Sequence, residues 1–354
     1  MTTPTDRLLA LPVQIESCSL EGLRQEVSTG FIRHTTVVRL EGGGHEGLGE
    51  DVVYDEVDQL AFQQAPPPPK LAGTWTLASL SGLLDALDLF PRPPVRGSSR
   101  LYRRWAFESA ALDLALRQAG ASLAEVLERT PRPVRFVVST SLGDPPSSAR
   151  VRAVLARRPE LRFKLDPRPT WDDALLAELA ATRAVATLDL KGRYTGTIVD
   201  NPADPELYRR LIAAFPSALL EDPGEGPGIA ELLEPVWDSV TWDAPIHALS
   251  DVLGGWPVLP RALNVKPSRF GLLSELLRTY AFCEARDIAC YSGGQFELGV
   301  GRGQLQYLAS LFHPDADNDC APRVYNLPEL PDGAELPASP LPPRPTATGF
   351  RWAE

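Results

Sequence analysis

The sequence has few cysteines and no long hydrophobic run. Its four cysteines are scattered without a CxxC pair, which predicts free thiols in a reducing compartment rather than a disulfide framework or a metal site. No segment approaches the roughly 20 apolar residues of a membrane span, and the N-terminus lacks an extended apolar region with a cleavage site. We therefore expect a cytoplasmic protein that does not insert into a membrane.

Several motifs and one kind of charge pattern are also missing. The formal net charge is -11, with acidic and basic residues interleaved, which argues against nucleic acid or an anionic membrane as a partner but permits a small anionic substrate. The four histidines show no HxxH or HExxH spacing, so a zinc site is not expected. No GxGxxG follows the first strand pattern, so a nucleotide-binding sheet loses its main support.

The first 130 residues combine strand and helix patterns. The β-branched run Thr35–Leu40 predicts a strand, the glycine-rich segment 41–50 predicts a turn, and Asp51–Tyr54 predicts that the strand resumes. Apolar residues at helical spacing follow over Arg103–Leu127, with a break at Gly120. These patterns predict an α+β domain over residues 1–130.

Seven short apolar runs alternate with amphipathic stretches in the rest of the chain. Such alternation indicates parallel strands joined by helices, and the short repeat favours a compact β/α barrel over residues 131–321, with an open doubly wound sheet as the alternative. The proline-rich segment 322–354 carries aromatic anchors, and we expect it to pack back across the first domain. The runs cover 134–140, 161–166, 185–191, 218–223, 240–245, 262–267 and 288–297.

Charged residues end five consecutive runs, in the order Lys164, Asp189, Glu221, Asp243 and Lys266. Because β/α barrels gather the carboxyl ends of their strands at one face, these side chains should point into one cavity. Three converging carboxylates repel one another unless a cation compensates, and oxygen ligands select a hard ion, Mg²⁺ or Mn²⁺. Singly, each acid is more often a helix cap and each lysine more often solvent-facing, so the joint order carries the prediction.

The flanking lysines suggest what such a site could do. Burial and a nearby cation lower the pKa of a lysine, as a base working near neutral pH requires. The metal would bind a substrate carboxylate and stabilise the enediolate that forms when the α-proton leaves.

Several motifs resemble the enolase superfamily, in the branch of the muconate-lactonizing enzymes and mandelate racemase. RFKL (162–165) resembles its Lys-x-Lys strand, with Lys164 in the position of the catalytic base, and NVKPSRFG (264–271) resembles its sixth-strand lysine motif. LDLK, LEDP and WDAP resemble the three strands that carry its metal ligands, and GGQFELGVGR (293–302) resembles its seventh strand. The resemblance implies a modified (β/α)7β TIM-type barrel with an α+β capping domain, Mg²⁺ on Asp189, Glu221 and Asp243, and Lys164 and Lys266 as catalytic residues.

By the same resemblance, the enzyme would be an isomerase or lyase acting on a small carboxylate, as a racemase, epimerase, cycloisomerase or dehydratase. The expected substrate-binding residues are Arg162, Lys191, Glu297, Gly294 and Tyr54, and the expected assembly is a homo-oligomer.

Three positions depart from the family pattern. Arg162 replaces the first lysine of Lys-x-Lys, Lys191 stands where the family usually has Asn, and Ala244-Pro follows Asp243 in place of Glu-Ser. Lys191 could contact the substrate anion, or it could neutralise the carboxylates and weaken metal binding. The alternative function is therefore a non-catalytic metabolite-binding barrel that has lost its metal through Lys191. A metal-dependent hydrolase would need histidine ligands at strand ends, which the sequence lacks.

Overall fold

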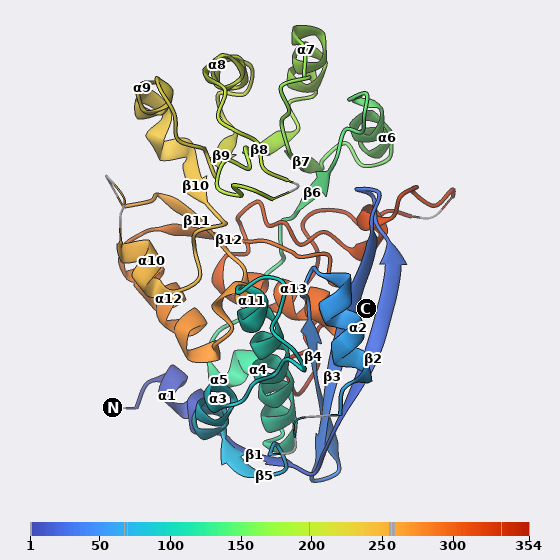
Figure 1. Ribbon diagram of the computed structural model, residues 1–354, viewed down its shortest axis with the longest axis vertical. Coiled ribbons are helices and arrows are strands. Elements are labelled where there is room, and N and C mark those ends of the chain that lie inside the picture. Colours follow the sequence, from blue (N-terminus) through green and yellow to red (C-terminus); the bar gives the residue numbers. More distant parts are fainter. Residues whose placement is uncertain are drawn as a thin grey trace.

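The computed structural model describes residues 2–66, 68, 70–197, 199–254, 256, 259–333 and 335–353. The molecule has two parts. An antiparallel sheet with its helices lies toward the bottom of Figure 1, and a curled parallel sheet lies above it, with helices on its outer side. Among the described residues, no helix is both long and apolar enough to span a bilayer.

The lower part is built on the antiparallel sheet β2–β3–β4 and helix α4. Glycines on β4 allow close packing, because a Cβ at Gly47 or Gly49 would lie 2.2 Å from the Ala110 carbonyl or 2.0 Å from the Ala106 carbonyl of α4. Its elements are α1 (Pro4–Leu9), β1 (Pro12–Ile15), β2 (Ser17–Glu26), β3 (Ile32–Gly42), β4 (His45–Asp51), α2 (Glu56–Gln64), β5 (Gly73–Thr76), α3 (Leu77–Ala86), α4 (Ser99–Gln118) and α5 (Leu123–Val126).

The prediction of a turn over residues 41–50 was wrong for most of that segment. The glycine-rich segment 41–50 is mostly strand, since the turn occupies only Gly43 and Gly44, both with positive φ. Two of the glycines that suggested a turn, Gly47 and Gly49, lie instead on β4, where α4 approaches the strand too closely for a side chain. The break at Gly120 is confirmed, since α4 ends at Gln118 and α5 begins at Leu123.

The upper part is a sheet of seven parallel strands in sequence order, β6 to β12. Each predicted apolar run contains one of these strands, so the β/α barrel prediction is confirmed. The strands are β6 (Val137–Thr140), β7 (Arg162–Leu165), β8 (Val185–Asp189), β9 (Leu219–Glu221), β10 (Val240–Trp242), β11 (Ala262–Val265) and β12 (Ala289–Ser292). The helices are α6 (Ala149–Arg157), α7 (Asp173–Thr182), α8 (Pro205–Ala214), α9 (Ile229–Leu233), α10 (Leu249–Leu253), α11 (Pro267–Phe270), α12 (Leu273–Ala285) and α13 (Val300–Phe312), with the 3₁₀ turns η1 (Glu234–Ser239) and η2 (Arg323–Asn326).

Two residues join the edge strands β6 and β12. Asn318 forms a parallel bridge with Phe136 next to β6, and Asp319 forms one with Gly293 next to β12. Backbone hydrogen bonds run from Val137 N–H to the Asn318 carbonyl (2.8 Å) and from Gly294 N–H to the Asp319 carbonyl (2.8 Å). The chain after α13 thus closes the barrel with a very short eighth strand.

The C-terminal segment returns along the molecule. Leu341 exchanges backbone hydrogen bonds with Val134 before β6. Farther on, the backbone N–H of Phe350 donates to Asp113 of α4, and the Arg351 guanidinium binds Asp113 and Glu46. This segment therefore contacts both the barrel and the antiparallel part.

Candidate metal centre

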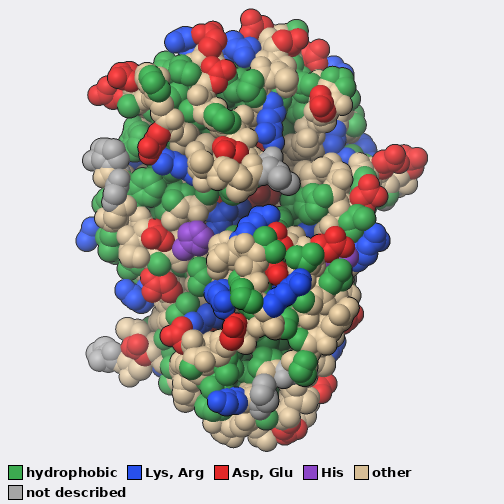
Figure 2. Space-filling view, viewed as in Figure 1, with side chains coloured by type: hydrophobic (Ala, Val, Ile, Leu, Met, Phe, Trp, Pro, Cys, Tyr) green, Lys and Arg blue, Asp and Glu red, His purple; other side chains and the backbone are tan. Residues whose placement is uncertain are grey.

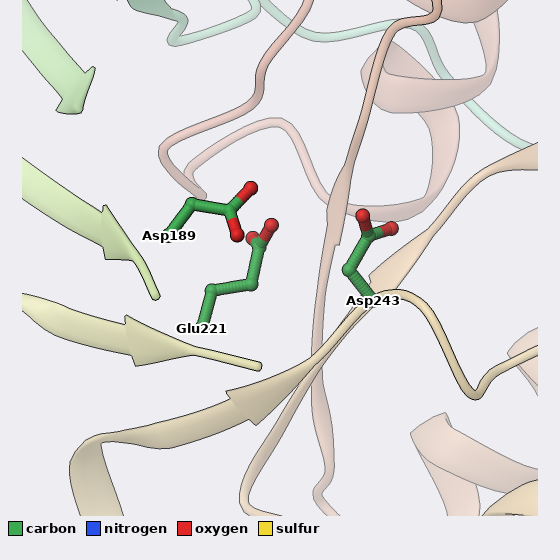
Figure 3. A group of neighbouring side chains, drawn as sticks. All are labelled: Asp189, Glu221 and Asp243. Atoms are coloured by element: carbon green, nitrogen blue, oxygen red, sulfur yellow. The ribbon is translucent and has the colours of Figure 1, made fainter. Parts of the chain in front are cut away.

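Three buried carboxylates meet at the carboxyl ends of neighbouring strands. Asp189 ends β8 and Glu221 ends β9 in direct register, and Asp243 follows β10. One carboxylate oxygen from each lies within 4.8 Å of the others, and all three side chains are fully buried. Figure 3 shows the carboxylates of Asp189 and Glu221 next to each other, with that of Asp243 set apart to the right. The predicted acids are therefore brought together.

Two lysines approach this triad from opposite sides. The Lys164 ammonium on β7 binds Glu221 and lies 3.0 Å from Oδ2 of Asp189. Lys266, directly after β11, places its ammonium 2.9 Å from Oδ2 of Asp243. A group seated above the triad would thus have one ammonium on each side.

Lys191 is a third ammonium at the same place. It contacts Oδ2 of Asp189, the oxygen that Lys164 also approaches, and lies 3.8 Å from Asp166. Only four of the 35 Lys and Arg residues of the chain are lysines, and three of them lie here. The fourth, Lys70, is exposed. At every other basic position except Lys70 the chain uses arginine, so the three clustered lysines are a signal in the sequence that an ammonium group is needed at the triad.

The charges shift the pKa values in different directions. Burial opposes ionisation of Asp189, but Lys164 and Lys191 outweigh it and lower the pKa of that carboxyl. At Asp243, Arg269 and Lys266 likewise outweigh burial and lower the pKa. At Glu221 burial dominates and raises the pKa to about 8, against the opposing effect of Lys164.

Lys164 is held as an ammonium group by the carboxylates around it. Burial alone would lower its pKa, but Asp189 and Glu221 raise that pKa well above the ordinary lysine value. Without a compensating cation at the triad, the carboxylates therefore keep Lys164 in its ammonium form.

The residues present fit a divalent cation. Their donor set is oxygen-only, as Mg²⁺ prefers. The buried Oδ1 of Asp243 accepts no hydrogen bond, although the Arg269 guanidinium lies 3.0 Å from it as an ion pair. Six acids and four basic side chains form this cluster, which leaves two formal negative charges, the charge that one divalent ion would balance. The acids are Asp166, Asp189, Glu221, Asp222, Asp243 and Asp319, and the basic residues are Lys164, Lys191, Lys266 and Arg269.

Polar residues that the sequence interpretation missed hold Asp243 in place. The Tyr194 hydroxyl donates to Oδ2 of Asp243 (2.9 Å) and accepts from Arg269 (2.8 Å), whose guanidinium lies 3.0 Å from Oδ1. Asp222 accepts the backbone N–H groups of Asp243 and Ala244 at 2.9 and 2.8 Å. These contacts orient the third acid before any ligand arrives.

Glu221 is held in a similar way. The Tyr291 hydroxyl (2.5 Å) and the Asn264 amide (3.2 Å) both donate to its Oε2. Asn264 precedes Lys266 by two residues and Asp166 follows Lys164 by two, so strand alternation alone could have placed both on the inner face.

The five predicted substrate-binding residues are spread around the site. Lys191 lies at the triad, whereas Arg162 binds Asp317, which precedes the closing strand. Glu297 pairs with Arg302 at 2.9 Å. The N–H of Gly294 is taken by the Asp319 carbonyl, so it is not available to a substrate carboxylate.

The remaining one, Tyr54, lies where the antiparallel part meets the barrel. Its ring stacks on Arg33, whose guanidinium carbon is 4.4 Å from the ring centroid. Arg33 in turn donates to the carbonyl of Gln295 after β12, and Phe31 meets Phe296 edge-on at 5.6 Å. Figure 2 shows Lys and Arg side chains gathered around the hollow between the two halves of the molecule.

Solved structures with the same fold belong to the enolase superfamily. A dipeptide epimerase from Enterococcus faecalis matches with a TM-score of 0.67 at 17% identity, over 96% of this chain and 100% of that chain. A muconate cycloisomerase from Pseudomonas fluorescens matches with a TM-score of 0.63 at 18% identity, over 97% and 95%. The fold is thus an enolase-superfamily barrel with its capping domain, as the sequence motifs predicted.

The chain belongs to the family described as domain of unknown function (DUF8230). The model of its N-terminal domain matches residues 6–126, and that of its C-terminal domain matches residues 130–327.

Two curated relatives are named as a racemase and a synthase. An N-succinylamino acid racemase from Thermus thermophilus is 28% identical over 322 residues, covering 86% of this chain and 81% of the relative. An o-succinylbenzoate synthase from Enterococcus faecalis is 27% identical over 280 residues, covering 75% and 72%.

Proposed function

We propose that this chain is a divalent-cation-dependent enzyme that removes a proton from the carbon next to a carboxylate. Asp189, Glu221 and Asp243 hold the cation, Mg²⁺ or Mn²⁺, and Lys164 and Lys266 transfer the proton. The observation that carries the proposal is the approach of these two ammonium groups to the triad from opposite sides. When bound, the cation supplies a Lewis acid that stabilises negative charge on the substrate carboxylate.

The side chains of this protein would do the rest. A substrate carbon between Lys164 and Lys266 presents its proton to one amine, and the other amine can return a proton to the opposite face. That arrangement suits racemisation or epimerisation, and it equally serves an elimination or cycloisomerisation in which the second lysine stabilises the anion. Tyr194, Arg269 and Asp222 keep Asp243 from turning away while charge moves.

The substrate class follows from the relatives. N-succinylamino acids, dipeptides and the substrate of an o-succinylbenzoate synthase are the compounds to try first, since proteins named for these reactions share the sequence or the fold. We propose that the capping domain, residues 1–130, closes over these substrates and contacts them through Tyr54. Arg162 and Glu297 would line the entrance of the site from the barrel, residues 131–321. Segment 322–354 would tie the two together. A cytoplasmic location and a homo-oligomer remain predictions from the sequence.

Proton exchange in deuterated solvent tests the proposal. With Mg²⁺ present, the wild type should incorporate deuterium at the α-position of at least one acid of this panel, which is seen as loss of the α-proton signal in ¹H NMR. For a racemase, Lys164→Ala should lower the exchange rate of one enantiomer about 100-fold or more. Lys266→Ala should lower the exchange rate of the other enantiomer to the same extent. Lys70→Ala is the matched control, because it removes the lysine that lies outside the site.

Two outcomes would contradict the proposal. Exchange that survives in the double variant Lys164→Ala, Lys266→Ala would exclude both lysines as the proton-transfer groups. A wild type that binds Mg²⁺ but exchanges no acid of the panel would count against the activity.

One observation favours a second candidate. Because Lys191 contacts Asp189, a metabolite-binding barrel without a metal is the alternative. Calorimetric titration separates the two, since that alternative requires that the wild type bind no Mg²⁺.

A further inference from the structure

A cavity of about 640 Å³ lies between the start of α13 and the returning C-terminal segment. Its volume falls in the range of small-molecule sites, about 300 to 1,000 Å³. Neither the triad nor its lysines line it. We propose that this cavity binds a small organic anion with an apolar body, independently of the proposed enzymatic function.

The first argument is charge. Four arginines line the cavity, Arg158, Arg302, Arg323 and Arg344, against one carboxylate, Glu335. That carboxylate is used by Arg158, 2.9 Å away. Arg302 is also paired, with Glu297 outside the lining, and the guanidinium groups still outnumber these two carboxylates. In a chain with a net charge of -11, such a local excess is the feature that attracts an anion.

Arg302 provides the second argument. Its side chain is 7% exposed and its terminal nitrogen pairs with Glu297 at 2.9 Å, but its buried Nε has no hydrogen-bond partner. A buried donor without a partner costs about 1 to 3 kcal/mol, and Arg302 lines the cavity, so a ligand oxygen that reached this nitrogen would be favoured.

The start of α13 adds little to anion binding. The backbone N–H groups of Gly299 and Gly301, which would otherwise face an anion, already donate to Glu50 at 2.8 to 3.0 Å. Recognition of the charged group therefore depends on the arginines. Arg344 is the freest of them, since it is exposed and makes no ion pair among the described residues.

The apolar part of the lining selects an apolar body. It is formed by Trp352, Leu336, Leu341 and three prolines at 337, 340 and 342. Prolines fix the backbone φ, so this part of the lining is preorganised rather than adaptable. An aromatic or branched aliphatic ring bearing a carboxylate or a phosphate matches both parts of the lining.

Fluorescence titration with 8-anilinonaphthalene-1-sulfonate tests the site, because this probe is an aromatic anion. Arg344→Gln removes a charge and Ala338→Trp removes volume, and each should weaken the probe's Kd at least tenfold. Arg261→Gln is the matched control, an exposed arginine paired with Asp238 away from the cavity, and it should leave Kd unchanged. Circular dichroism melts of all variants check that the fold is intact.

Competition identifies the anionic group. Displacement of the probe by phthalate or by phenyl phosphate would support the site and show whether it takes a carboxylate or a phosphate. Displacement by neither, or equal probe affinity in the wild type and both cavity variants, would overturn the proposal.

Discussion

At the scale of single residues, Lys191 is the side chain that most directly competes with a metal ion. Its ammonium contacts Oδ2 of Asp189, one of the three candidate ligands. Replacing it by Asn, the residue usual in the resembled family, removes that charge and leaves Lys164, 3.0 Å away, as the remaining ammonium beside this oxygen. Lys191→Asn should therefore bind Mg²⁺ roughly tenfold more tightly than the wild type by isothermal titration calorimetry.

A matched control separates local competition from net charge. Lys70→Asn makes the same change in overall charge at an exposed position and should leave the Mg²⁺ affinity unchanged. An affinity that falls in Lys191→Asn would show instead that the lysine orients Asp189 for the ion.

Single residues show most clearly which parts of the site can be predicted from the sequence. The triad and its two flanking lysines were predicted from their order at strand ends, because strand direction fixes where such residues point. Tyr194 and Arg269 could not be predicted, since they reach Asp243 from a loop and a short helix whose paths depend on tertiary packing. The raised pKa of Lys164 in the absence of a cation was not predicted, because the number of carboxylates around it is a property of the fold.

At the scale of secondary structure, one carboxylate couples the capping sheet to the barrel. Glu50 on β4 is buried and accepts the backbone N–H groups of Leu298, Gly299 and Gly301 at the start of α13, at 2.7 to 3.0 Å. Negative charge at a helix N-terminus also interacts favourably with the helix dipole. Glu50→Gln should lower the free energy of unfolding in urea by about 1 to 3 kcal/mol, because buried donors lose acceptors.

Glu41→Gln is the control for that measurement. Glu41 is exposed and bonds only Ser17 and the edge of the same sheet, so its replacement should change stability by less than about 0.5 kcal/mol. Equal losses in the two variants would show that Glu50 does not join cap and barrel energetically.

The helices and strands whose apolar residues recur at a regular spacing were predicted best. The seven barrel strands follow from their short apolar runs, and α4 follows from its helical spacing and the break at Gly120. The turn around Gly43 was predicted too long, because the glycines of β4 serve close packing against α4 rather than chain reversal. The closing strand escaped prediction, since Asn318 and Asp319 carry no apolar pattern and pair only because β6 and β12 meet there.

At the scale of the whole molecule, a buried histidine at the barrel seam makes stability depend on pH. His313 lies between Asn318, whose side-chain oxygen is 2.7 Å from Nδ1, and Tyr280, whose hydroxyl is 3.2 Å from Nε2. Burial lowers the pKa of His313 to about 4, from an ordinary value of 6.5. Asn318 bonds both β6 and β12 through its backbone and side chain, so this cluster belongs to the closure of the barrel.

The sign of the dependence follows from proton binding. The unfolded chain takes up a proton at His313 below about pH 6.5, whereas the folded chain does so only near pH 4, so acid favours unfolding between these values. Between pH 7 and pH 5 this one residue should lower the free energy of unfolding by about 2 kcal/mol. His313→Gln, which keeps a hydrogen-bonding side chain but cannot titrate, should show that much less loss when urea melts at the two pH values are compared. Because His45 is exposed, His45→Gln should behave as the wild type does, and identical pH dependence in all three proteins would mean that the seam opens before His313 is protonated.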